Sequence, residues 1–223
     1  DNPAAWRGHL ENLLSAPQKT KKVEHHPALP WREIGAFMQA LRTMPGAAAL
    51  ATEFIILTNC RTSEAINATW AEFDLGEKRW TIPAERMKAA KEHVIPLSEP
   101  ALAVLQRLKA EAKEGEFVFP GGKKNTALSN MACLALLKRM GRGDLTVHGF
   151  RSSFRDWAGE ATAHPREVIE HAMSHQLKDK AEATYQRGSL LERRRVLMAD
   201  WANYCAKPAA TGVVVPLQSA KSA

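Results

Sequence analysis

The spacing of the apolar residues changes period twice along the chain, and this limits the possible folds more than any other feature. Over the first part, apolar residues recur three or four positions apart, as on one face of a helix. Three short segments, 70–75, 79–83 and 93–97, then alternate β-branched or aromatic residues with polar ones. Helical spacing returns after them. The pattern predicts a mainly α-helical fold with a small three-stranded antiparallel β-sheet.

Helices are expected before and after these three strands in the sequence. Those before the strands cover Trp31 to Met44 and Ala47 to Leu57, with a shorter one after Arg61. Those after the strands cover 100–112, 128–140, 150–159, 165–171 and 190–204. Ala47 to Leu57 is the most apolar segment, but Thr52 and Glu53 interrupt it. It is therefore expected to be a buried helix rather than a membrane span, and no membrane association is expected.

The two ends of the chain differ from its middle. Trp6, Leu10, Leu13 and Leu14 share one helical face near the start, and a polar, proline-punctuated stretch follows. Residues 1–28 are therefore predicted to be the end of a preceding domain plus a linker, and 29–207 the main domain. Residues 208–223 lack any period and are expected to form a flexible tail.

Composition favours a polyanionic partner inside a reducing compartment. Lys and Arg number 31 against 24 Asp and Glu, which gives a formal net charge of +7 and an isoelectric point near 9.5. The three cysteines lie far apart and form no CxxC pair, so neither a disulfide framework nor a structural zinc site is expected. These features predict a cytoplasmic protein with a polyanionic partner such as nucleic acid, although charge alone does not choose between DNA, RNA and an anionic membrane. No metal or other cofactor is expected.

Four separated segments carry side chains that bind or protonate phosphate oxygens. The first reads Thr58-Asn59-Cys60-Arg61-Thr62-Ser63-Glu64, and the second is the basic stretch around Lys88. The third is His148-Gly149-Phe150-Arg151, and the fourth combines Met173-Ser174-His175 with Ala183-Thr184-Tyr185. In this order, the four segments resemble the conserved boxes of the tyrosine recombinase, or phage integrase, family.

The resemblance covers the chain from about Pro27 to Pro208. It is closest to integrases of temperate phages and genomic islands, which share the motif Ile82-Pro83-Ala84-Glu85-Arg86-Met87-Lys88. Residues 1–14 resemble the last helix of the family's core-binding domain. Asn59 and Ser174 stand where many members have Gly, and Asn adopts the left-handed conformation more cheaply than most residues.

The resemblance implies the fold of a tyrosine recombinase catalytic domain and a metal-independent reaction that breaks and rejoins DNA. Tyr185 would be the nucleophile and form a 3′-phosphotyrosine, and Lys88 would protonate the departing 5′ oxygen, with Lys91 as the alternative. Arg61 and Arg151 suit the charged transition state, because a guanidinium stays protonated and offers phosphate a planar fork of donors. His148 and His175 are expected to bind phosphate and move the Tyr185 proton, with Glu64 supporting the arginines.

The expected partners follow from the same resemblance. They are double-stranded attachment sites, on which the protein would act as a homotetramer to integrate or excise a mobile element. A host factor that bends DNA and an excision factor are further expected partners. Besides the catalytic set, Arg86, Lys91, Lys123 and Lys124 are expected to contact DNA.

Several alternatives remain open from the sequence. The chemistry also suits a type IB topoisomerase, and a basic DNA-binding module without catalysis is the alternative from another class. Tyr204 is the only other tyrosine, but it shares a helical face with Leu197 and Trp201 and is interpreted as packing. The run Arg193-Arg194-Arg195 is interpreted as an exposed helix surface, either solvated or facing phosphate.

Overall fold

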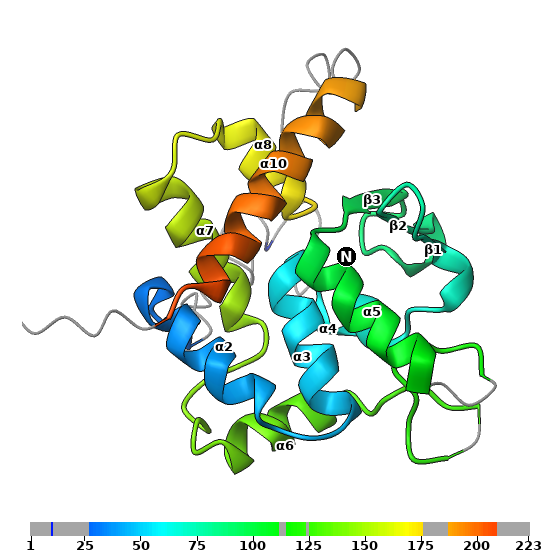
Figure 1. The fold of residues 1–223 in the computed structure, drawn as a ribbon. Helices are drawn as coiled ribbons and strands as arrows, with labels where there is room; N and C mark the ends of the chain where they lie inside the picture. Colours follow the sequence, from blue (N-terminus) through cyan, green and yellow to red (C-terminus); the bar gives the residue numbers. More distant parts are fainter. Residues whose placement is uncertain (1–9, 11–26, 112–114, 124, 176–186, 209–223) are drawn as a thin grey trace, which may run out of the picture.

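The central element of the fold is helix α3 (Ala47–Thr58), which is buried along most of its length. The computed structural model describes residues 10, 27–111, 115–123, 125–175 and 187–208. Helices α2 (Ile34–Arg42), α5 (Glu99–Glu111), α6 (Ala132–Arg139), α7 (Gly149–Ala161) and α10 (Arg187–Ala206) surround it (Figure 1). The prediction of a buried helix here is confirmed.

The polar residues of α3 are satisfied within the protein. Thr52 and Thr58 donate their hydroxyl hydrogens to the main-chain oxygens four residues earlier, over 2.8 and 2.6 Å. Glu53 accepts a hydrogen bond from Arg42 of α2 at 2.7 Å. A helix that is apolar on every face is stable only when it is covered on every side, and these bonds let its polar groups be covered too.

The sheet contains three antiparallel strands in the order β1 (Phe73–Asp74), β2 (Arg79–Ile82) and β3 (His93–Pro96). The predicted class, mainly helical with a small three-stranded sheet, is confirmed. The first strand is shorter than the predicted 70–75, because Trp70–Glu72 forms a 3-10 helix, η4. The Glu72 carboxylate accepts hydrogen bonds from the hydroxyl of Thr69 and from the Trp80 indole, which closes this turn against β2.

Two predicted helices begin about one turn before the observed ones, whereas α3 and α5 agree with their predicted ranges to within one residue. The expected helix at 31–44 consists of the 3-10 helix η3 (Trp31–Glu33) followed by α2, and the one expected at 128–140 is the shorter α6. At each start a main-chain nitrogen donates a hydrogen bond to the carbonyl oxygen three residues earlier. These bonds are Glu33 N to Pro30 O and Ala132 N to Ser129 O, both 2.9 Å. Apolar periodicity does not distinguish such 3-10 turns from a true helix.

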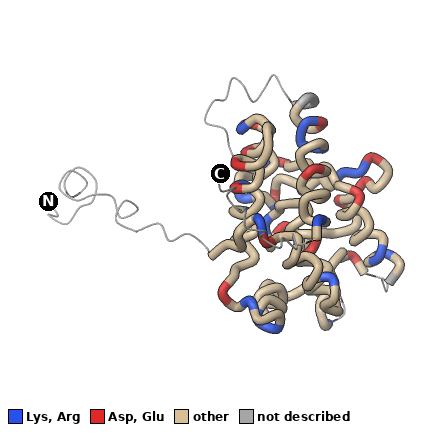
Figure 2. Tube along the Cα trace, turned by 60° about the vertical axis from the view of Figure 1, so that its left-hand side comes forward, with Lys and Arg blue, Asp and Glu red and all other residues tan. Residues whose placement is uncertain are grey.

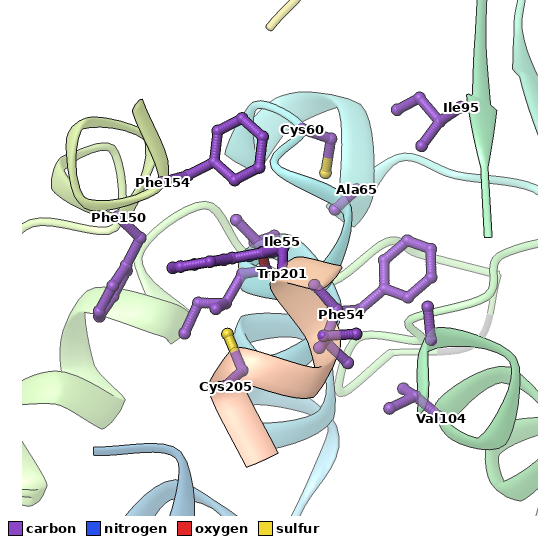
Figure 3. Close-up of a cluster of buried hydrophobic side chains, with 14 of the residues drawn as sticks. Phe54, Ile55, Cys60, Ala65, Ile95, Val104, Phe150, Phe154, Trp201 and Cys205 are labelled. Carbon is purple, nitrogen blue, oxygen red and sulfur yellow. The ribbon is translucent and has the colours of Figure 1, made fainter. Parts of the chain in front are cut away.

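Helix α10 closes the core from the C-terminal side. Its Trp201 lies among Ile55, Phe150 and Phe154 (Figure 3) and donates its indole hydrogen to the main-chain oxygen of Ile56 at 2.7 Å. The Trp201 and Phe154 rings meet edge to face at 5.4 Å. Cys60, Cys133 and Cys205 are all buried free thiols. The core therefore unites residues from both ends of the described chain.

The segment that enters the fold packs against α7. Thr146 donates its main-chain hydrogen to Pro27 O at 3.3 Å, and the Ser153 hydroxyl donates to Leu29 O. The expected N-terminal helix and most of its linker, and the tail from residue 209 onward, lie outside the described residues. Within the described part of the chain, no helix is both long and apolar enough to cross a membrane.

Candidate functional site

The turn that follows α3 presents Arg61. Asn59 ends the helix in the left-handed conformation, with φ of 53°, and Arg61 then begins the short helix α4 (Thr62–Ile66). Glu64 is buried and accepts two hydrogen bonds of 2.7 Å from Arg61, one from its main-chain nitrogen and one from Nη1. The Arg61 side chain keeps 25% of its surface exposed. Glu64 thus fixes the arginine while leaving part of its guanidinium accessible.

Arg151 of α7 joins this turn to a second one. Its side chain is 4% exposed, and it donates from Nη1 to the main-chain oxygen of Asn59 and from Nη2 to that of Met173, the latter over 2.6 Å. Burial, and then the charge of Arg61, lower the pKa of Arg151, whereas the carboxylate of Glu64 acts in the opposite direction. The two arginines therefore lie within electrostatic reach of each other.

The second turn presents His175. Helix α8 (Arg166–Ala172) ends at Met173, Ser174 takes a left-handed φ of 54°, and His175 follows. The left-handed residue ends the helix, so His175 lies just beyond it, in agreement with the predicted helix 165–171. His175 is exposed, and its Nδ1 lies 2.6 Å from a carboxylate oxygen of Glu170. Burial alone would raise the pKa of Glu170, but the hydrogen bond and charge of His175 lower it.

His148 lies at the start of α7, one helical turn before Arg151. It occupies the N-cap position of this helix and is exposed. Because residues three apart share one side of a helix, the His148 position lies on the Arg151 side of α7. Its neighbour Gly149 fits closely against the entry segment, since a Cβ there would lie less than 3.0 Å from Pro27 O. The packing of Pro27 on this helix thus positions the two residues.

Lys88 and Lys91 occupy the loop between β2 and β3, and both are exposed. Burial, then the charge of Arg194 and then that of Lys91 lower the imidazole pKa of His171 of α8, so Lys91 lies within electrostatic reach of this helix. Arg86 at the base of the loop is held within the protein, because it donates to the Glu72 carboxylate and to the main-chain oxygen of Glu64. Arg86, expected to contact DNA, thus ties the loop to the α4 turn.

One further predicted site residue, Lys123, lies apart from this cluster in the described structure. Lys123 is exposed in the loop between α5 and α6, where its main-chain oxygen accepts from Thr126. Lys124 and Tyr185 lie outside the described residues. The other tyrosine, Tyr204, packs as expected, because its ring meets those of Trp157 and Trp31 at 5.6 Å each.

Sequence reasoning missed two buried polar residues behind the cluster. His93 of β3 is 7% exposed and Arg194 of α10 is 4% exposed, and Arg194 donates from Nη1 to Val94 O at 2.7 Å. The interpretation of 193–195 as an exposed surface is therefore wrong for Arg194. Three consecutive arginines on a helix point in different directions, and this was the one available signal that their environments differ.

The cluster combines fixed positive charge with exposed polar groups. Over the described residues, basic and acidic side chains are interspersed (Figure 2). Two acids at the site, Glu64 and Glu170, are engaged by Arg61 and His175. Within the described ranges, no group of three His, Cys, Asp or Glu is placed to hold a metal ion. An arrangement of guanidinium, imidazole and ammonium groups is suited to binding an anionic phosphodiester.

Known proteins resemble this chain in sequence. The model of the phage integrase family matches residues 28–189. Prophage integrase IntA of Escherichia coli K12 is 35% identical over 208 residues, covering 92% of this chain and 50% of the relative. The integrase of Enterobacteria phage P4 is 33% identical over 210 residues, covering 86% and 48%. The chain thus spans about half the length of these relatives.

Solved structures share the fold at low sequence identity. The integrase of mycobacterium phage Brujita superposes with a TM-score of 0.58 at 16% identity, covering 84% of this chain and 61% of that one. A lambda integrase tetramer bound to a Holliday junction gives 0.55 at 18% identity, covering 77% and 55%. Given the extent of the family match and the similarity to curated integrases, the chain belongs to the phage integrase family.

Proposed function

We propose that this chain is the catalytic part of a site-specific DNA recombinase, which cuts and rejoins DNA through a 3′-phosphotyrosine at Tyr185. The observation that carries the proposal is the meeting of Arg61 and Arg151 at one place, held by Glu64 and by the main-chain oxygens of Asn59 and Met173. Such a pair provides fixed positive charge where phosphoryl transfer develops negative charge.

Each remaining group has a role in this scheme. The Tyr185 oxygen attacks phosphorus, and the bond to the 5′ oxygen breaks. Lys88, or Lys91 in its place, gives that oxygen a proton from the β2–β3 loop. His148 and His175 hydrogen-bond the phosphate and move the Tyr185 proton. The ester keeps the energy of the broken bond, so the reverse attack rejoins the strand without a nucleotide.

The proposed partners are double-stranded attachment sites, on which four copies assemble to integrate or excise a mobile element. This is supported by the solved relatives, since one is a lambda integrase tetramer on a Holliday junction and another is the Tn1549 transposon integrase with circular intermediate DNA. The curated relatives are about twice as long as this chain. We propose that segments outside it contribute to DNA binding, and that host bending and excision factors assist.

Covalent capture tests the proposal directly. The chain is incubated, in the presence of a chelator, with a pool of radiolabelled nicked duplexes of random sequence, and protein-bound DNA is recovered under denaturing conditions. We expect an adduct from the wild type and from Tyr204→Phe but none from Tyr185→Phe. An adduct that survives Tyr185→Phe and disappears in Tyr204→Phe would overturn the choice of nucleophile. A chain that binds DNA but never forms an adduct would be a non-catalytic binding module.

A further inference from the structure

Arg194 is a buried arginine without an acidic partner among the described residues. It is 4% exposed, its Nη1 donates to Val94 O at 2.7 Å, and its buried Nε finds no hydrogen-bond partner in the part of the chain that the structure describes. Its neighbours in sequence differ, since Arg193 pairs with Glu167 and Arg195 with Glu192. Burying an unpaired charge is unfavourable, so its retention calls for a reason other than stability.

Two histidines lie near Arg194, and no acidic side chain of the described ranges pairs with it. His93 of β3 and His171 of α8 lie beside each other, with ring centroids 6.4 Å apart. Burial, and then the charge of Arg194, lower the imidazole pKa of His93 to about 3 and that of His171 to about 4. Both rings are therefore neutral near pH 7, and the positive charge of Arg194 remains.

Arg194 also connects helix α10 to strand β3, next to the arginine pair. Helix α10, on which it lies, packs side by side with α8 and also contacts β3 (Figure 1). The loop between β2 and β3, which carries Lys88 and Lys91, is called the lysine loop here. Val94, the acceptor, comes three residues after Lys91, where this loop enters β3. The charges of Arg61 and Arg151 also reach His93, which places this strand next to the arginine pair. One side chain thus joins α10 to the end of the lysine loop.

We propose that Arg194 is a positioning residue for strand cleavage, which holds the lysine loop in register with Arg61 and Arg151 through its bond to β3. The inference rests on the proposed function. A loop with two long, exposed lysines has many conformations, and protonating a departing oxygen requires a donor within hydrogen-bond reach. Anchoring one end of the loop to a rigid helix reduces that freedom before DNA binds.

Arg194→Met separates this role from a merely structural one. Replacing a buried, unpaired charge by an apolar side chain of similar length is often neutral or stabilising, so we expect an unchanged or raised melting temperature. The rate of adduct formation should nevertheless fall roughly tenfold to a hundredfold, as for a misplaced catalytic group. This rate is measured on a duplex recovered as an adduct of the wild type in the capture experiment. Arg194→Lys keeps a charge and a donor and should lose less. Arg139→Met, on the distant helix α6, serves as the control and should keep the wild-type rate.

A modified leaving group identifies the step that is lost. When sulfur replaces the bridging 5′ oxygen, the departing thiolate needs no proton, because a thiol has a pKa of about 8.5. This substrate should restore Arg194→Met to within a fewfold of the wild type, as it should restore Lys88→Ala or Lys91→Ala, but it should not restore Arg151→Ala. A wild-type rate for Arg194→Met on the oxygen substrate, or a slow rate that sulfur fails to restore, would overturn the inference. Absence of any adduct from the wild type would instead refute the proposed function.

Discussion

Arg151 donates a hydrogen bond from Nη1 to the main-chain oxygen of Asn59, a residue 92 positions earlier in the chain. Asn59 precedes Arg61 by two residues, so this bond fixes the distance between the two arginines through the backbone rather than through a shared acid. Nη2 meets Met173 O in the same way and fixes the turn that carries His175. A single guanidinium therefore aligns three segments of the site.

Arg151→Lys should reduce both stability and activity. The planar guanidinium of Arg151 bridges the main-chain oxygens of Asn59 and Met173. A lysine has a single ammonium group and cannot bridge both. We expect a loss of about 3 kcal/mol in the free energy of unfolding, because two buried charged hydrogen bonds are disturbed. Adduct formation should fall about 100-fold or more, as when a fixed donor is removed from a transition state. Urea unfolding and adduct kinetics measure the two effects, and a fully active Arg151→Lys would contradict the assigned geometry.

Asn59→Gly should stabilise the protein. Asn59 has φ of 53°, and among the described residues neither the oxygen nor the nitrogen of its buried side-chain amide has a hydrogen-bond partner. Glycine relieves the left-handed strain and removes the buried amide, for a gain of up to about 1 kcal/mol. Asn59→Val should lose about 2 kcal/mol, because a β-branched residue resists this conformation.

Asn125→Gly is the matched control for that experiment. Asn125 has nearly the same φ, 55°, but is exposed, so its amide is hydrated and only the backbone term changes. Thermal unfolding of the two glycine variants should therefore show a larger gain at position 59. Equal gains would mean that the buried amide of Asn59 is not a destabilising feature.

Gly149→Ala should disrupt the start of α7. A Cβ at this position would lie too close to the main-chain oxygen of Pro27, and backbone cannot move aside as a flexible side chain can. We expect a loss of roughly 2 kcal/mol in the free energy of unfolding and slower adduct formation, since His148 and Arg151 lie on this helix. Gly159→Ala on the same helix meets nothing within 4 Å and should gain up to about 1 kcal/mol from helix propensity. Tolerance of alanine at 149 would contradict the close fit.

Acid should destabilise the fold through His93. Its pKa is about 3 in the folded state, below the usual 6.5, so the unfolded chain binds more protons between these values. The stability present above pH 6.5 is therefore lost as pH falls towards 3, by about 1.4 kcal/mol for each unit crossed. His93→Gln removes this titration, and its free energy of unfolding should change less between pH 7 and pH 4. The prediction is wrong if the free energy of unfolding falls equally with pH in the wild type and in His93→Gln.

The salt dependence of DNA binding should separate Arg86 from Lys123. Arg86 is engaged by Glu72 and by the main-chain oxygen of Glu64, whereas Lys123 is exposed. We expect Lys123→Gln to reduce the slope of log affinity against log salt by about 1, as for one lost phosphate contact. Arg86→Gln should leave that slope unchanged but lower the melting temperature. A reduced salt slope for Arg86→Gln would instead mean that Arg86 contacts DNA.

The sequence by itself determined the class of fold and the chemistry that is proposed. Apolar periodicity located the buried helix α3 and the three strands, because spacing along the chain directly reflects which faces are covered. The four separated motifs resemble those of the tyrosine recombinase family, and this resemblance pointed to Arg61, Lys88, Arg151 and Tyr185, whose residue types suit phosphoryl transfer. Element ends were less accurate, since 3-10 turns such as Trp70–Glu72 follow the same apolar pattern as their neighbours.

Only the tertiary structure decided which polar groups are held by the protein and which are left accessible. Arg86, Arg194 and Arg61 have the same side chain, yet the first is bound to an acid, the second is buried without one and the third is partly exposed. These differences depend on contacts between residues far apart in the chain, such as Arg194 with Val94. Local sequence carries no information about such partners, because burial and hydrogen bonding are determined only when distant segments pack together.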